Sequence, residues 1–221
     1  MFVDLHMHEM RYSPDSKQCL EDMVVKAKQM GLDAIAITDH DSMGLADFAQ
    51  EYAEKVNFPI YVGVEYYSLQ GDIVTFGIQD FPKERIPAQD FIDYVYAEGG
   101  VTIAAHPFRN NNRGLEHNLA TIKNLTGVEV LNGSTTDAAN LLAYQYCQDR
   151  GMAAIGSSDS HVLDRIGRYA TYLEEEALTT EELVTVIKKK LTKPAIHTPQ
   201  GYVIFQPQLD TILQKLQKNS R

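Results

Sequence analysis

Short apolar runs that alternate with helical patterns constrain the fold of this chain most strongly. The runs are rich in valine and isoleucine, are bounded by glycine, aspartate or proline, and have the length of buried strands. Strands are predicted over residues 2–5, 34–38, 60–64, 73–78, 101–105, 128–131 and 153–156. Because most of these strands are separated by a segment long enough for a helix, the pattern predicts an α/β fold with parallel strands joined by crossover helices.

The segments between the strands carry apolar residues at helical spacing. The first helix has one apolar face formed by Leu20, Met23, Val24 and Ala27. Gly31 can end that helix in the left-handed conformation. Further helices are predicted over residues 45–55, 88–97, 137–149, 181–191 and about 207–218. Thr179 and Glu182 have the spacing of a capping box at the start of the helix over 181–191.

One connection between strands is too short for a helix. Only YYSLQGD, residues 66–72, separates the third strand from the fourth, so these two strands should form a hairpin with Gly71 in its turn. No linker rich in proline, glycine or serine divides the chain. A single domain over residues 1–221 is therefore expected.

Composition and charge exclude several classes of protein. The net charge of −10 disfavours long nucleic acid as a partner, although a small anion in a local cationic pocket remains compatible with it. No apolar run approaches the roughly 20 residues of a membrane span, and the N-terminus lacks the features of a signal peptide. Cys19 and Cys147 are too few for a disulfide framework. We therefore expect a cytoplasmic protein.

Histidines and acids are concentrated where the predicted strands end. They are His6, His8, His40, Glu65, His106, Asp159 and His161. In α/β proteins with parallel strands the active site lies at the carboxyl ends of the strands. Side chains two residues apart in a strand point to the same face, so the HxH and DxH pairs can converge on one ion.

Imidazole and carboxylate together favour Zn, Mn or Fe over Ca or Mg as the bound metal. The donors exceed what one ion can use, which indicates two or three ions in one cleft. Each motif taken alone also fits a structural role, such as an Asx turn, a proline bend or an N-cap. Their joint placement after successive strands favours the metal site. His117 and His197 have no such placement and are interpreted as surface or packing residues.

The motifs DLHMH, YSPDS, ITDHD, GVE, AAHP and GSSDSH, in this order, resemble the PHP (polymerase and histidinol phosphatase) family. The resemblance runs from Asp4 to about Tyr172. It implies a distorted seven-stranded (β/α)7 barrel, a trinuclear metal site at the C-terminal rim of the strands, and hydrolysis of phosphoesters. The implied ligands are His6, His8, Asp15, His40, Glu65, His106, Asp159 and His161.

The resemblance also implies how these ligands are shared. One ion would be held by His6, His8, Glu65 and Asp159, a second by Asp15, His40 and His161, and a third by Glu65 and His106. The sequence departs from the family pattern near the fourth strand, where many relatives carry a further histidine and this chain carries Asp72. We predict that a hairpin brings Asp72 to the rim beside Glu65, where it replaces that histidine as an oxygen ligand.

The expected activity is hydrolysis of a small phosphomonoester by a hydroxide that the metal ions activate. A small substrate is expected because larger relatives that act on nucleotides insert a helical subdomain between Glu65 and His106, where this chain has one helix. Arg109 is the preferred candidate to neutralise the phosphate, ahead of Arg113, Arg165 and Arg168. Asp41 is a candidate to orient His40 or to protonate a leaving group.

Other functions remain open. An exonuclease or phosphodiesterase that acts on short oligonucleotides or nucleotides would use the same metals. A hydrolase of carbon–nitrogen bonds is less favoured because no lysine stands at a strand end. A non-catalytic module is less favoured because nearly all the ligand positions are filled.

Overall fold

A computed structural model describes residues 1–207. The strands are β1 (Phe2–Asp4), β2 (Ala34–Ile37), β3 (Ile60–Val62), β4 (Val64–Tyr67), β5 (Asp72–Phe76), β6 (Val101–Ala104), β7 (Gly127–Asn132), β8 (Ala153–Ser157), β9 (Tyr169–Leu173), β10 (Thr192–Thr198) and β11 (Gly201–Ile204). The helices are α1 (Leu20–Gln29), α2 (Ala46–Val56), α3 (Ala88–Ala97), α4 (Asp137–Arg150) and α5 (Thr180–Lys188), with short 3-10 helices at η1 (Glu116–Ala120) and η2 (Leu163–Arg165). The helix predicted over 207–218 lies, beyond its first residue, outside the described residues.

The strands form two sheets. The first has the order β11-β10-β9-β1-β2-β3 and the second the order β4-β5-β6-β7-β8. Neighbours are parallel from β1 to β3 and from β6 to β8, as predicted, and antiparallel elsewhere; contrary to the prediction, β5 and β6 are antiparallel although the helix α3 connects them. The predicted hairpin is confirmed: β4 and β5 are antiparallel, with Tyr67 opposite Asp72.

The expected seven-stranded closed barrel is not confirmed. Within residues 1–207, β3 and β11 are the edge strands of the first sheet, and β4 and β8 are the edge strands of the second. Single bridges connect the sheets beyond the strand ends, between Met7 and Ser160 and between His40 and Glu65. The fold is a mixed α/β arrangement of two sheets around a shared apolar core.

The strand predicted over residues 60–64 is divided into β3 and β4, which belong to different sheets. The division falls at Gly63, where a Cβ atom would lie 2.3 Å from the backbone oxygen of Thr75. Three further strands, β9, β10 and β11, were not predicted. They carry polar residues and Pro194 within short segments, and this composition masks a strand pattern. The predicted capping box at Thr179 and Glu182 is confirmed at the start of α5.

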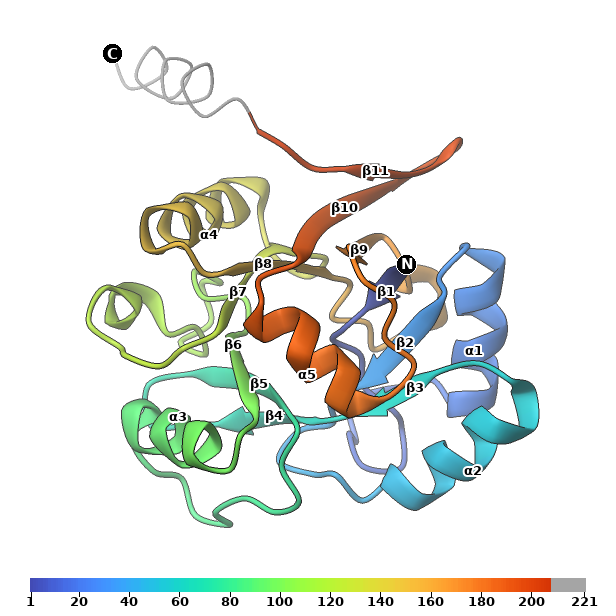
Figure 1. The fold of residues 1–221 in the computed structure, drawn as a ribbon, viewed down its shortest axis with the longest axis horizontal. Coiled ribbons are helices and arrows are strands. Elements are labelled where there is room, and N and C mark those ends of the chain that lie inside the picture. The colour runs from blue at the N-terminus through green and yellow to red at the C-terminus, as the bar shows by residue number, and fades with distance from the viewer. Residues whose placement is uncertain (208–221) are drawn as a thin grey trace.

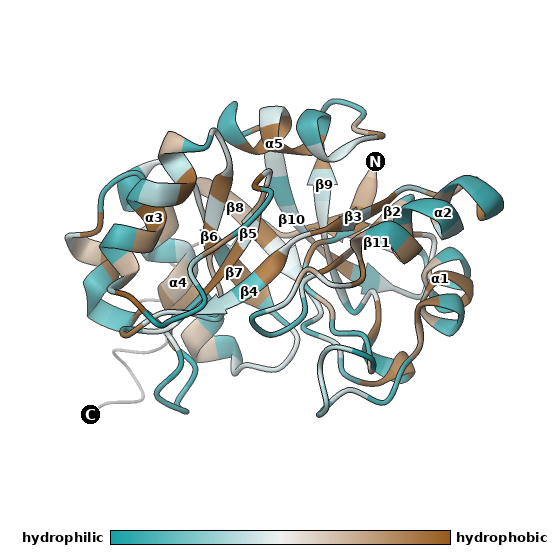
Figure 2. Ribbon diagram, turned by 90° about the horizontal axis from the view of Figure 1, so that it is seen from below, coloured by the Kyte–Doolittle hydropathy of each residue, from teal (hydrophilic) through white to brown (hydrophobic). Residues whose placement is uncertain are grey.

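Three apolar clusters hold the layers together. The helices α1 and α2 cover the outer face of the first sheet, and α3 and α4 cover the outer face of the second (Figure 1). Figure 2 shows mostly apolar residues in central strands such as β5 and β7, whereas the same helices alternate between apolar and hydrophilic residues, as expected for elements that bury one face.

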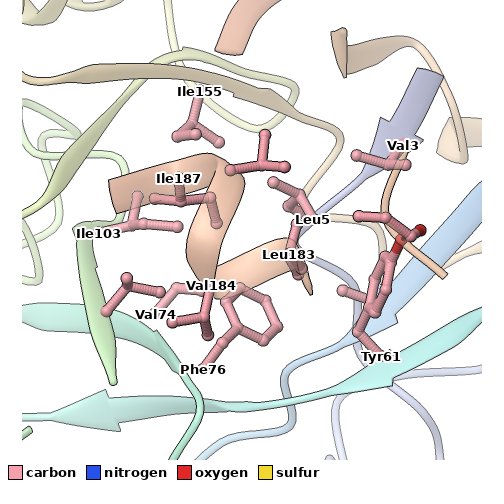
Figure 3. Packing of buried hydrophobic residues seen from close by; sticks show 14 of the residues in the cluster. Val3, Leu5, Tyr61, Val74, Phe76, Ile103, Ile155, Leu183, Val184 and Ile187 are labelled. Carbon is pink, nitrogen blue, oxygen red and sulfur yellow. Dashed lines mark hydrogen bonds between the residues drawn. The ribbon is translucent and has the colours of Figure 1, made fainter. Parts of the chain in front are cut away.

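The third cluster fills the space between the sheets. Leu5 and Tyr61 from the first sheet's side meet Val74 and Ile103 from the second, and α5 closes one end with residues such as Ile187 (Figure 3). Because apolar side chains fill this interior from the α5 end, the polar side chains are left at the opposite end of the strands. Among the described residues, no helix is both long enough and apolar enough to cross a membrane.

Candidate metal centre

The strand ends opposite α5 bring together the nine side chains that the sequence assigned to a metal site. They are His6 and His8 after β1, Asp15 in the following loop, His40 after β2, Glu65 in β4, Asp72 at the start of β5, His106 after β6, and Asp159 and His161 after β8. Within residues 1–207, three sets of donor atoms lie within 4.8 Å of one another: His8, His40 and His161; His6, His8 and Asp159; and Glu65, Asp72 and His106.

His6 and His8 lie at the centre of this cluster. Their Nε2 atoms are 3.0 Å apart and both rings are fully buried. Asp159 Oδ1 lies 3.7 Å from Nε2 of His6 and 3.4 Å from Nε2 of His8. Glu65 approaches the same two nitrogens at 3.3 and 3.6 Å. As predicted from strand alternation, the two imidazoles therefore converge, with Met7 between them in the bridge to Ser160.

Buried acids fix which nitrogen each of these rings presents. Nδ1 of His6 lies 2.8 Å from Glu129 Oε1. An ionised carboxylate can only accept a hydrogen bond, so His6 donates through Nδ1, and Nε2 is the nitrogen of this ring that can bind a metal. Nδ1 of His8 lies 3.2 Å from the hydroxyl of Ser13, which in turn donates to Asp39 at 2.7 Å. Carboxylates commonly orient metal-binding histidines in this way.

Asp15 lies between His40 and His161. Its Oδ2 atom is 3.2 Å from Nε2 of His40 and 3.3 Å from Nε2 of His161. The loop that carries Asp15 is held in place because Ser13 N–H donates to the carbonyl of Glu9 at 2.9 Å. Asp15 is also the most exposed member of the cluster, at 59% of its side chain. Asp15, His40 and His161 therefore form the solvent-facing side of the site.

Glu65 links the two sides of the cluster. Its Oε1 atom lies 3.0 Å from Nε2 of His106, and its Oε2 atom lies 2.7 Å from Nδ1 of His40. The bridge between His40 and Glu65 sets this spacing, because it joins the end of β2 directly to β4. A carboxylate in this position can serve two cations at once.

Asp72 reaches the rim beside Glu65, as the hairpin predicted. Its Oδ2 atom lies 3.6 Å from Nε2 of His106. Both of its oxygens also accept from Arg113, at 2.6 Å from Nε and 2.9 Å from Nη2. Asp72 is thus both a member of the cluster and the partner of an arginine.

The two residues considered for catalysis have different positions. Arg109 enters the cluster: Nη2 contacts Oδ2 of Asp159 and donates to Asn132 Oδ1 at 2.9 Å. The carboxylate of Asp41 instead accepts from the backbone N–H of Tyr67 at 2.9 Å. Asp41 therefore occupies a structural position at the start of the loop after His40.

The other residues considered from the sequence lie apart from the donor sets. Arg165 donates to Ser134 at 3.4 Å, and Arg168 lies over the ring of Tyr169. His117 contacts the hydroxyl of Tyr146 at 3.4 Å, and His197 packs against Tyr202.

Burial and charge act against each other throughout the cluster. Burial alone would raise the pKa of Glu65, but the positive charge of His6 and the close contacts with His106 and His40 outweigh it and hold that pKa well below its usual value. Burial likewise raises the pKa of Asp159, and His6 and His8 more than compensate. Both carboxyls are therefore anions that require positive charge beside them.

The donor set fits divalent transition metals. Glu65 Oε2 and His40 Nδ1 face each other at 2.7 Å without hydrogen-bonding geometry, and both atoms are buried without another partner among the described residues. Two buried acceptor atoms this close destabilise a site unless both can bind the same cation. Nitrogen and carboxylate oxygen donors, without a cysteine among them, are suited to Zn, Mn or Fe.

Several buried polar residues of the site were missed in the sequence. Glu129 stands in the apolar strand β7, where its neighbours Val128 and Val130 are fully buried. Besides holding His6, it accepts from Asn132 Nδ2 at 2.9 Å. A lone acid inside an apolar strand was the available signal, because a buried carboxylate needs partners. Asp39, which accepts from Ser13, gave a similar signal, because it is a buried acid next to His40.

Comparisons with known proteins find related sequences over most of the chain. A model of the PHP domain matches residues 4–149, and a model of a PHP-associated region matches residues 137–192. An uncharacterized protein of Methanocaldococcus jannaschii is 28% identical over 148 residues, which are 62% of this chain and 85% of that protein. The alpha subunit of DNA polymerase III of Chlamydia pneumoniae is 34% identical over 71 residues, which are 32% of this chain and 6% of the subunit.

Solved structures share the fold at low sequence identity. A two-domain protein of Bacteroides vulgatus, described as containing a PHP-like metal-dependent phosphoesterase, has a TM-score of 0.73 at 21% identity; the match covers 89% of this chain and 65% of that one. A lesion-specific endonuclease of Pyrococcus furiosus has a TM-score of 0.57 at 15% identity, with 92% and 57% covered. The model of the PHP domain covers more than half of this chain, which therefore belongs to the PHP domain family.

Proposed function

We propose that this protein is a metal-dependent phosphoesterase that hydrolyses a small phosphomonoester. The observation that carries the proposal is the convergence of five histidines and four carboxylates at one end of the strands, with two arginines among them. We also propose that the protein acts in the cytoplasm.

Bound divalent ions would lower the pKa of a water molecule and polarise the phosphoryl group. The residues that would hold them are the three sets described above, together with Asp15. Glu129 and Ser13 each accept from Nδ1 of a ring, so that Nε2 of His6 and of His8 is the nitrogen available to a metal. The convergence of these donors at one end of the strands supports the proposal, although the sheets are not closed into a barrel.

The arginines supply the binding of the substrate's phosphate. Nε of Arg109 is buried and has no hydrogen-bond partner among the described residues, while its Nη2 atom is fixed by Asp159 and Asn132. A guanidinium held in this way can bind phosphate oxygens without first losing side-chain freedom. The net charge of −10 disfavours a long polyanion and favours a small phosphorylated substrate.

Cleavage of short oligonucleotides or nucleotides is the second candidate function. It is favoured by the shared fold of the lesion-specific endonuclease. Both activities need the same donors, so only the substrate separates them.

A substrate panel tests the proposal. Protein loaded with Mn²⁺ or Zn²⁺ is assayed on phosphomonoesters and on a short single-stranded oligonucleotide, with His8→Ala and His117→Ala as matched variants. We expect release of inorganic phosphate that falls at least about a hundredfold in His8→Ala, since removal of even an indirect metal-site partner costs 10–100-fold. His117→Ala should retain full activity. Shortened oligonucleotides without terminal phosphate release would favour the second function, and activity unchanged in His8→Ala would refute both.

A further inference from the structure

Asp72 and Arg113 are joined at three points. Nε and Nη2 of Arg113 donate to the two carboxylate oxygens, and the backbone N–H of Asp72 donates to the carbonyl of Arg113 at 2.7 Å. The carboxylate is fully buried, whereas the arginine side chain is 33% exposed. A planar fork on a carboxylate is the strongest form of this ion pair and occupies both oxygens.

The backbone around Arg113 is shaped to keep this contact. A Cβ atom on Gly71 would lie 2.7 Å from the carbonyl oxygen of Arg113, and one on Gly114 would lie 2.2 Å from the carbonyl oxygen of Pro107. Both glycines therefore allow an approach that no larger residue permits. The loop that carries Arg113 is thus fixed against the β4–β5 hairpin by its backbone as well as by its side chain.

An aromatic ring adds a further contact. Tyr67, which pairs with Asp72 across the hairpin, lies 4.4 Å from the guanidinium carbon of Arg113. Arg85 contacts the same ring at 3.6 Å but is exposed and forms no hydrogen bond or ion pair with Asp72 among the described residues. Arg85 is therefore a matched control for Arg113, because it shares the ring but not the carboxylate.

The ion pair engages the carboxylate that a third cation would need. A cation shared by Glu65, His106 and Asp72 would need an oxygen of Asp72, and Arg113 holds both. A guanidinium already supplies positive charge there, and it would repel a second cation at the same carboxylate. The contact of Arg109 with Asp159 is different, because it leaves Oδ1 of Asp159 facing His6 and His8.

We propose that Arg113 takes the place of a third metal ion, so that the centre binds two ions and Asp72 holds the arginine instead of a metal. This inference rests on the metal centre of the proposed function. It replaces the expectation that Asp72 is an oxygen ligand. The N–H groups of Arg113 that Asp72 leaves free supply the third positive charge to the phosphate of the substrate.

Counting bound metal tests the inference without an activity assay. The protein is loaded with excess Mn²⁺, unbound metal is removed, and metal per chain is measured by mass spectrometry. We expect two ions in the wild type, three in Arg113→Met, where Asp72 is released, and two in Arg85→Met. Three ions in the wild type, or two in Arg113→Met, would overturn the inference. Less than one ion in every variant would instead refute the metal centre and with it the proposed function.

The variant Asp72→Asn separates the two roles of the carboxylate. We expect it to bind two ions, as the wild type does. A fall from three ions in the wild type to two in Asp72→Asn would show that Asp72 is a ligand. Circular dichroism checks that the variant folds, and if it does not, the comparison of Arg113→Met with Arg85→Met decides.

Discussion

Glu129 Oε1 lies 2.8 Å from Nδ1 of His6, so a buried acid of β7 orients a histidine that follows β1. The other oxygen of Glu129 accepts from the backbone N–H of His106 at 2.7 Å. One carboxylate therefore fixes the ring of one candidate ligand and the backbone of another. His106 has a φ of +29°, a conformation that non-glycine residues rarely adopt, and the hydrogen bond that its backbone N–H donates to Glu129 helps to maintain it.

Glu129→Gln should weaken metal binding while leaving every candidate ligand in place. The amide can turn an NH₂ group toward His6, which would favour the wrong tautomer of that ring. We expect metal affinity to fall about 10–100-fold, as is usual for groups that orient ligands. Competition with a chromophoric chelator measures this affinity. The exposed Glu176→Gln is the control, and equal affinities in the two variants would contradict the role of Glu129.

Removal of metal should lower thermal stability. Glu65 and Asp159 are buried anions, and a cation that binds only the folded chain stabilises it by about 2.7 kcal/mol at a hundredfold excess over its Kd. The melting temperature should fall with EDTA and recover when Mn²⁺ is restored. His117→Ala should show the same difference as the wild type, whereas His8→Ala should show a smaller one. A melting temperature that is insensitive to EDTA would contradict a high-affinity site.

Residues at strand ends could be predicted because their signal is local. Strand alternation is enough to place His6 and His8 on one face, and the carboxyl ends of parallel strands meet at one edge. Glu65 and Asp72 were placed together because their hairpin is short. These predictions need only the order of the elements, and they did not depend on closure of a barrel.

The partners of these residues depend on contacts between distant segments. Glu129 meets His6 across 123 positions, and Arg113 meets Asp72 across 41. The division between β3 and β4 at Gly63 depends on the backbone of β5, which approaches Gly63 too closely for a side chain. Neither the ion pairs nor the division into two sheets has a periodic pattern in the sequence.

Gly63→Ala should destabilise the junction between the sheets. The new methyl group would lie 2.3 Å from the backbone oxygen of Thr75, which cannot move without disturbing β5. Overpacking of this kind costs roughly 1–3 kcal/mol and sometimes more. Gly31→Ala is the comparison: it has free space and only the strain of its φ of +76°, about 1–2 kcal/mol. Urea denaturation measures both, and an unaffected Gly63→Ala would show that the junction can relax.

Ile187→Ala should destabilise the fold from the end opposite the metal site. Ile187 is fully buried where α5 closes the space between the sheets. Truncation of such a residue costs about 2–5 kcal/mol through lost burial and the cavity that remains. Val25→Ala on α1, where the side chain is 54% exposed, should have little effect on urea unfolding. Metal content should be unchanged in both variants, and its loss in Ile187→Ala would indicate that α5 supports the site directly.

The two cysteines should react with alkylating reagents at very different rates. Cys147 is fully buried, and burial raises the pKa of its thiol to about 12, whereas Cys19 is partly exposed. Only the thiolate reacts, so Cys147 is protected both by its pKa and by its neighbours. At pH 8 iodoacetamide should label one cysteine in the native protein and two in urea. Cys19→Ala should take no label until it unfolds. Rapid labelling of native Cys19→Ala would show that α4, which carries Cys147, opens readily.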